Sequence, residues 1–159
     1  MQRNAGAVAD VAYTAGFYRE MAPNHLAFAA IAAGSAPGLG LQPRRVLELG
    51  FGQGFGLALL AAANPDVMFE GCDLDAANVA HAHRLSEDAG LENVTLSRAG
   101  FEEAAARRDD RNDVDIAMMH GVLSWISPGA RDAAIGIVEK RLRPGGLFYA
   151  SYNCMPGWA

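Results

Sequence analysis

Short apolar runs alternate with longer segments of helical pattern from residue 45 to the end of the chain. Nearly continuous apolar runs of this length are typical of strands that are buried on both faces of a sheet. The runs that predict strands are 46–49, 67–72, 94–97, 114–119 and 147–152. The segments between them that predict helices are 54–63, 75–89, 102–108 and 127–142. We therefore expect five strands, each separated from the next by one helix.

The part of the chain before the first strand has a different pattern. Asn24 is expected to cap a helix over 25–33, and Gly34 is expected to end it. The stretch 34–43 holds three glycines and two prolines, which predicts a connector. The chain thus divides into an N-terminal helical cap with its connector, 1–43, and an α/β core, 44–159, within a single domain.

Strands that alternate with helices predict a mainly parallel sheet with helices on both faces, which is the doubly wound, Rossmann-like α/β class. In such folds ligands bind at the carboxyl ends of the strands, near the point where the strand order reverses. The loops after the strands are therefore the places to look for functional residues.

Composition excludes several classes of function. The chain has 159 residues and a formal net charge of −5, with no run of Lys or Arg, so a nucleic-acid partner is not expected. No apolar stretch is long enough to span a bilayer, and the first ten residues lack the apolar core of a secretory signal. We expect a cytoplasmic protein without a membrane partner.

The sequence predicts no metal site. Cys72 and Cys154 lie far apart in the sequence and form no CxxC pair, so they are interpreted as reduced, small hydrophobic residues. His81 and His83 are two residues apart on a predicted helix, so they point in different directions and cannot share a metal ion.

The strongest local motif is the glycine-rich segment that follows the first predicted strand. Glu48 precedes Gly50, Phe51, Gly52 and Gly54, in the pattern acidic-x-G-x-G-x-G. Glycines let a backbone turn tightly and approach a ligand closely. The dinucleotide fingerprint G-x-G-x-x-G fails in both registers, which argues against a nicotinamide cofactor. The acid suits a ligand that carries an ammonium group and a sulfonium, although a glycine-rich turn that holds nothing is the alternative.

A second acidic residue ends the next predicted strand. Asp73 stands 19 residues after Gly54, where a carboxylate can accept hydrogen bonds from a ribose diol. The alternative is a helix cap, but Asp75 fits that role better. Asp73 therefore predicts a nucleoside ligand.

The loops after the third and fourth strands supply the other candidates. Gly100 and Phe101 follow the third strand, where Phe101 either packs on an adenine ring or belongs to the core. His120 follows the fourth strand, so it is expected at the same edge of the sheet. Its unperturbed pKa is near neutrality, so it is the candidate general base, with a loop-positioning role as the alternative.

Four segments together resemble one family. They are 46–54, Gly71-Cys72-Asp73-Leu74, His120-Gly121-Val122-Leu123-Ser124-Trp125, and Ser151-Tyr152-Asn153 with Pro156-Gly157-Trp158. These strings resemble bacterial class I S-adenosylmethionine (SAM) dependent methyltransferases that carry a methyltransferase regulatory domain. The resemblance implies SAM as the cofactor, with Leu74 beside Asp73 in its site. It also implies that Tyr13 and Phe17 close over the cofactor, and it suggests a protein lysine or a small molecule as acceptor.

Two departures from the family pattern bear on the site: Phe51 replaces a small residue or Cys, and Gly100 replaces an acid. The resemblance also implies that the last two strands of the complete fold are missing. An open last strand would favour a homo-oligomer. The alternative functions are a non-catalytic SAM-binding or interaction module and a nicotinamide-dependent oxidoreductase.

Overall fold

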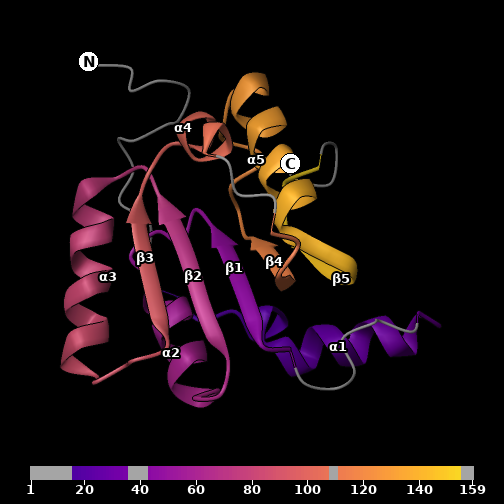
Figure 1. Cartoon of the computed structure of the whole chain (residues 1–159), viewed down its shortest axis with the longest axis horizontal. Coiled ribbons are helices and arrows are strands. Elements are labelled where there is room, and N and C mark those ends of the chain that lie inside the picture. Colours follow the sequence, from indigo (N-terminus) through magenta and orange to yellow (C-terminus); the bar gives the residue numbers. More distant parts are fainter. Residues whose placement is uncertain (1–15, 36–42, 108–110, 155–159) are drawn as a thin grey trace.

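A computed structural model describes residues 16–35, 43–107 and 111–154. Its described part contains one sheet of five parallel strands in the order β3-β2-β1-β4-β5 (Figure 1). The strands are β1 (Arg45–Leu49), β2 (Met68–Asp73), β3 (Val94–Arg98), β4 (Val114–Met119) and β5 (Leu142–Ala150). The helices are η1 (Arg19–Met21), α1 (Pro23–Ala32), α2 (Phe55–Ala63), α3 (Ala76–Asp88), α4 (Phe101–Ala106) and α5 (Pro128–Arg141). The predicted doubly wound α/β fold is confirmed.

The sheet separates two apolar layers, because successive strand residues point to opposite faces. Val46 of β1 packs with α2 and α3, whereas its neighbours Leu47 and Leu49 pack with α5. All six residues of β4 are buried, as expected for a central strand covered on both faces. The two layers hold the carboxyl ends of β1, β2 and β4 at one edge of the molecule.

Helix α1 begins two residues before the predicted boundary. Pro23 takes the first helical position, where its fixed φ suits the helix and its missing amide costs nothing. Asn24 therefore lies inside the helix, where its side-chain oxygen accepts from the amide of His25, and the predicted capping role is wrong. The end of the helix agrees with the prediction, since the Gly34 amide donates to the carbonyl of Ile31.

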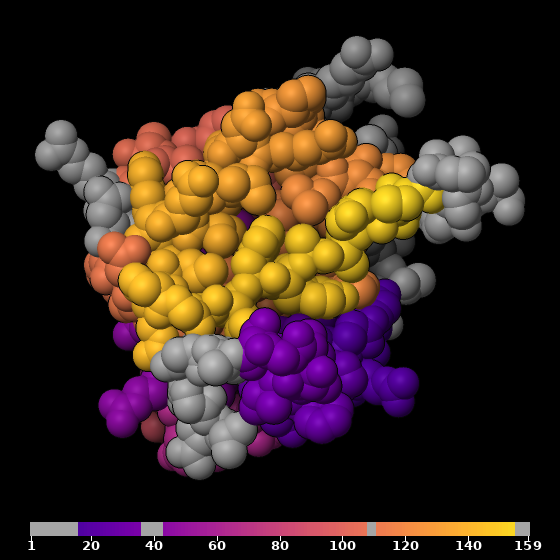
Figure 2. Space-filling view, turned by 90° about the vertical axis from the view of Figure 1, so that its right-hand side faces the viewer, coloured from indigo at the N-terminus to yellow at the C-terminus, as the bar shows by residue number. Residues whose placement is uncertain are grey.

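Strand β5 begins at Leu142, five residues before the predicted start. Leu142 pairs with Val114, but the next pairing joins Leu147 to Ile116, so the intervening residues bulge out of the register. Buried Asp115 accounts for part of this shape, because its carboxylate pairs with Arg143 in the bulge at 2.8 Å. Figure 2 shows β5 on the surface, between α5 and α1.

Candidate functional site

The glycine-rich bend after β1 leaves an open space beside its backbone. Gly52 has a φ of +58°, and a Cβ added there would meet no atom of the described residues within 4 Å. Gly54 caps α2 in the same left-handed region, where a Cβ would lie 2.3 Å from that of Ala82 on α3. A side chain at Gly54 would therefore push the two helices apart, whereas at Gly52 it would enter the open space. The two glycines thus have different roles, one in packing and one facing solvent.

Asp73 lies directly against this bend. Its Oδ2 accepts from the amide of Gly52 at 2.8 Å, and its Oδ1 accepts from the amide of Asp75 at 2.9 Å. Burial raises the pKa of Asp73, and these two hydrogen bonds oppose that rise. Asp75 itself caps α3 by accepting from the amide of Ala77 at 2.7 Å, as the sequence predicts. The backbone thus holds the Asp73 carboxylate at the edge of the open space.

Glu48 is buried beneath the bend and is incompletely bonded. Its Oε2 has no hydrogen-bond partner among the described residues, and the residue is 5% exposed. Burial and the nearby charge of Asp73 raise the pKa of Glu48 to about 7. A buried acceptor without a donor costs free energy, which a cationic or hydrogen-bonding ligand would recover. This unpartnered carboxylate oxygen therefore fits a ligand whose ammonium group can donate to it.

The remaining residues predicted for the cofactor divide between core and surface. The side chain of Phe51 is buried in the core, so only its backbone belongs to the bend. Leu74 is 38% exposed, and a Cβ on Gly100 would lie 3.6 Å from it. Phe101 is partly buried and packs against the buried cluster on the α5 side.

His120 stands beside the bend at the end of β4, within a polar and aromatic cluster. A Cβ on Gly50 would lie 2.7 Å from Val122, so the segment after β4 touches the bend. The Nδ1 atom of His120 lies 3.0 Å from the hydroxyl of Tyr149 and 3.1 Å from that of Ser151. Burial lowers the pKa of His120, which favours the neutral imidazole.

Tyr18 is a site residue that the sequence did not predict, and so is Tyr149 on β5. The ring of Tyr18 stacks on the imidazole of His120, with the ring centroids 3.9 Å apart. Tyr13, the residue predicted for a comparable role, lies outside the described residues, and Phe17 is 46% exposed. The described N-terminal segment therefore reaches the carboxyl end of the sheet. Tyr18, which directly precedes η1, is the aromatic residue that contacts His120 there.

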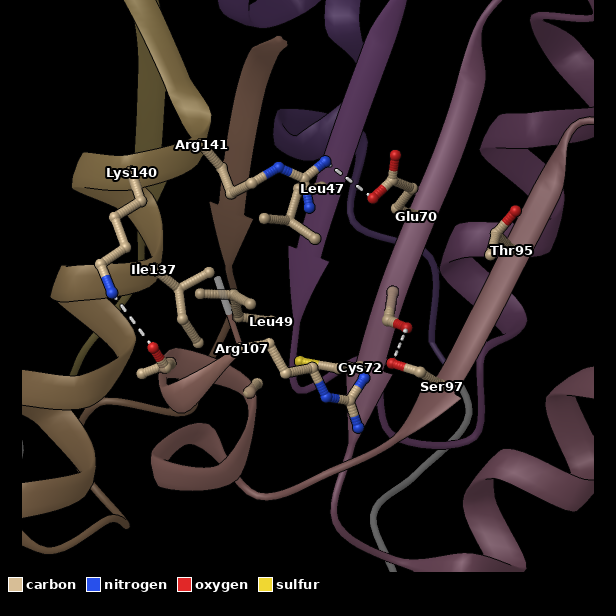
Figure 3. A pocket seen from close by; sticks show the side chains of 13 residues that line it. Leu47, Leu49, Glu70, Cys72, Thr95, Ser97, Arg107, Ile137, Lys140 and Arg141 are labelled. Atoms are coloured by element: carbon tan, nitrogen blue, oxygen red, sulfur yellow. Dashed lines mark hydrogen bonds and ion pairs between the residues drawn. The ribbon is translucent and has the colours of Figure 1, made fainter. Parts of the chain in front are cut away.

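A separate cavity of about 220 Å³ lies on the face of the sheet that α4 and α5 cover, between these helices and strands β1, β2 and β3 (Figure 3). Its lining includes Leu47, Cys72, Ser97 and Arg141 but none of the glycines of the bend. Burial raises the pKa of the Cys72 thiol to about 12, so this group stays protonated. The cavity is distinct from the predicted nucleoside site.

Two kinds of feature are absent from the described residues. No group of three or more His, Cys, Asp or Glu side chains that could hold a metal ion occurs among them. Within the same ranges, no helix has both the length and the apolar character needed to cross a membrane.

The parallel sheet, the glycine bend and the acid at the end of β2 define a Rossmann-like nucleoside-binding domain of the class I methyltransferase fold. Residues 46–146 match the family model described as "Methyltransferase domain". The chain therefore belongs to this family of methyltransferase domains, whose methyl donor is SAM.

Individual relatives agree with this assignment. An uncharacterized protein of Synechocystis sp. is 36% identical over the whole chain, which corresponds to 31% of that protein. The structure of PKMT2 from Rickettsia typhi in complex with AdoHcy is 28% identical, with a TM-score of 0.81 over 92% of this chain and 27% of that one. A SAM-dependent methyltransferase from Geobacter sulfurreducens in complex with S-adenosyl-L-homocysteine is 27% identical, with a TM-score of 0.53 over 77% of this chain and 45% of that one. The chain thus spans about a third or less of the first two proteins.

Proposed function

We propose that this domain binds SAM in the space beside Gly52 and transfers its methyl group to an acceptor near His120. The observation that carries the proposal is the bond between the Gly52 amide and Asp73, which places a carboxylate at the open side of the glycine bend. A carboxylate has about four lone-pair sites, so Asp73 can still accept from a ribose diol while it holds the bend. The open side of Gly52 admits the backbone contact that the sugar and its substituents need.

Glu48 is proposed to face the charged end of the cofactor. Its unpartnered buried oxygen suits the ammonium group, and a cation close by would favour the ionised carboxylate. Leu74, Gly100 and Phe101 are proposed to border the adenine. Because Gly100 replaces the expected acid, the backbone of the loop after β3 would read the edge of the base.

SAM supplies the activated methyl group, so the protein mainly aligns the acceptor with it and excludes water. An amine acceptor would have to arrive with its nitrogen unprotonated, and its lone pair would form the bond to the methyl carbon as the carbon–sulfur bond breaks and its electrons pass to sulfur. The positive charge would then lie on the acceptor nitrogen, which would lose a proton to solvent. The resemblance to enzymes that modify protein lysines makes a lysine amine our first proposal for the acceptor, and a small-molecule amine the second.

We also propose that the chain forms a single domain, with 1–43 as cap and connector and 44–159 as core. Tyr13 is proposed to close over the cofactor. We propose a cytoplasmic location and no nucleic-acid or membrane partner.

Isothermal titration calorimetry with SAM, S-adenosylhomocysteine and NAD tests the binding proposal. We expect both adenosyl compounds to bind and NAD not to bind. Asp73→Ala should abolish binding, whereas Asp75→Ala should lower stability by about 1 kcal/mol through loss of the helix cap and leave affinity unchanged. Binding of NAD alone would favour the oxidoreductase alternative and refute the proposal.

Methyl transfer needs a separate measurement. Radiolabelled SAM and a cell lysate should give labelled protein or small molecules with the wild type but not with Asp73→Ala. SAM binding without any labelled product would instead support a non-catalytic binding module.

A further inference from the structure

Two hydroxyl groups, one on β5 and one just after it, lie against the same nitrogen of His120, and a backbone amide after β4 binds one of them. The amide of Gly121 donates to the Ser151 hydroxyl oxygen at 2.7 Å. The Ser151 oxygen lies 3.1 Å from the Nδ1 atom of His120, and the Tyr149 hydroxyl lies 3.0 Å from the same atom. Ser151 and Tyr149 also share a hydrogen bond. The direction of the hydrogen bonds in this cluster determines which ring nitrogen carries the proton.

A backbone amide can only donate, so it sets the direction at one end of the cluster. With Ser151 accepting from Gly121, the Ser151 hydroxyl can donate to Tyr149, and the Tyr149 hydroxyl can donate to Nδ1. Both hydroxyl hydrogens then have an acceptor inside the cluster, and bonds aligned in one direction strengthen one another. If Nδ1 carried a proton instead, one hydroxyl hydrogen would have no acceptor within the cluster.

We infer that Tyr149 and Ser151 fix His120 as the neutral tautomer with its proton on Nε2, so that the ring is a hydrogen-bond donor toward the ligand. The identity of that ligand rests on the proposed function, whereas the tautomer does not depend on it. The two hydroxyl residues are positioning residues, since they act through His120.

The electrostatic surroundings agree with this assignment. Burial lowers the pKa of His120, while the carboxylate of Glu20 opposes the change. Burial and the same carboxylate raise the pKa of Tyr149, so its phenol keeps the hydrogen that it donates. Tyr18 stacks on the imidazole and holds the plane of the ring.

The assignment determines what His120 can recognise. Nε2 lies across the ring from Tyr149 and Ser151 and has no hydrogen-bond partner among the residues that the structure describes. An Nε2–H group binds a carboxylate or carbonyl oxygen and cannot remove a proton from an amine. The oxygen belongs either to the amino-acid end of SAM or to the acceptor. On this inference His120 positions a substrate and is not the general base.

Nitrogen-15 NMR of the imidazole rings tests the tautomer directly, in the protein without ligand. We expect His120 in the wild type to show the Nε2–H form at about pH 8. The double variant Tyr149→Phe, Ser151→Ala should show a mixture of both tautomers, and each single variant should lie between. Observation of the Nδ1–H form in the folded wild type would overturn the inference whatever the protein binds.

Binding measurements then show whether the oxygen that accepts from Nε2–H belongs to the cofactor or to the methyl acceptor. His120→Gln keeps a side-chain N–H donor, whereas His120→Phe removes it and keeps a flat ring for Tyr18. If the oxygen is the cofactor's, His120→Phe should weaken S-adenosylhomocysteine binding about tenfold, and 5′-methylthioadenosine, which lacks the carboxylate, should bind unchanged.

If the oxygen is the acceptor's, both nucleosides should bind His120→Phe normally, and labelling of lysate proteins should fall for His120→Phe but not for His120→Gln. Unchanged binding and unchanged labelling in His120→Phe would refute the donor role. A wild type that binds neither nucleoside would refute the proposed function instead, and the NMR result would still decide the tautomer.

Discussion

Gly52 both shapes the glycine bend and borders the proposed ligand site. Its amide holds Asp73, its φ of +58° disfavours any side chain, and its Cα faces open space. A substitution there changes the backbone and the open space beside it at the same time.

We expect Gly52→Val to abolish SAM binding in calorimetry, because the branched side chain would fill the open space. The left-handed backbone should also cost about 1–2 kcal/mol of stability. Gly90→Val is the matched control, since Gly90 has a φ of +63° and is also surrounded by open space, at the far end of α3. This control should lose similar stability in urea titrations and keep its affinity; normal binding by Gly52→Val would contradict the pocket assignment.

Glu48 gives a prediction about pH. Its pKa rises from 4.5 to about 7 on folding, so the protonated form is the one that burial favours. The contribution of this carboxyl to the free energy of unfolding is therefore fully present below about pH 4.5 and is lost as pH rises through 7. The pKa difference corresponds to about 3 kcal/mol of free energy of unfolding. Glu48→Gln should therefore raise the free energy of unfolding of the ligand-free protein at about pH 8 by more than it does at about pH 5.

The same variant should weaken SAM binding, because the amide cannot neutralise an ammonium group. Urea titrations at both pH values and calorimetry test the two parts. Equal stability changes at both pH values would show that the carboxyl does not titrate in this range.

At the scale of elements, charged side chains at the amino ends of the strands join segments that lie far apart in the sequence. Asp115 on β4 accepts from the amides of Arg44 and Arg45 at 2.6 and 2.8 Å and pairs with Arg143 before the regular part of β5. Glu70 on β2 pairs with Arg141 at the end of α5 at 2.8 Å. These contacts tie β1, β2 and the α5–β5 corner together on the side opposite the glycine bend.

Asp115→Ala should therefore lower the free energy of unfolding by about 3 kcal/mol, because it leaves partly buried donors without their acceptor. Glu103→Ala is the control, since its pair with Arg107 is exposed and should contribute less than about 1 kcal/mol. Chemical denaturation measures both changes. Similar small losses in the two variants would show that the Asp115 contacts do not hold the corner.

At the scale of the whole molecule, β5 is the last strand of the described sheet and lies at its surface (Figure 2). An unpaired strand edge can pair with another chain. We expect this 159-residue chain to self-associate through β5, as measured by size-exclusion chromatography with light scattering. Phe148→Lys, which places a charge on the exposed part of β5, should shift the population toward monomer. A purely monomeric wild type would contradict this expectation.

The sequence by itself determined the order of strands and helices, the glycine bend and the cap at Asp75. These features depend on residues close together in the chain, whose hydrophobic pattern and backbone preferences act locally. The acid at the end of β2 was also predictable, because parallel strands bring their carboxyl ends to one edge.

Only the tertiary structure decided how residues far apart in sequence meet. Tyr18 stacks on His120, and Phe51 turns into the core instead of toward the ligand. β5 begins early, where Arg143 meets an acid on a neighbouring strand. Such contacts depend on how the layers pack and on which buried groups need partners, and no short stretch of sequence carries that information.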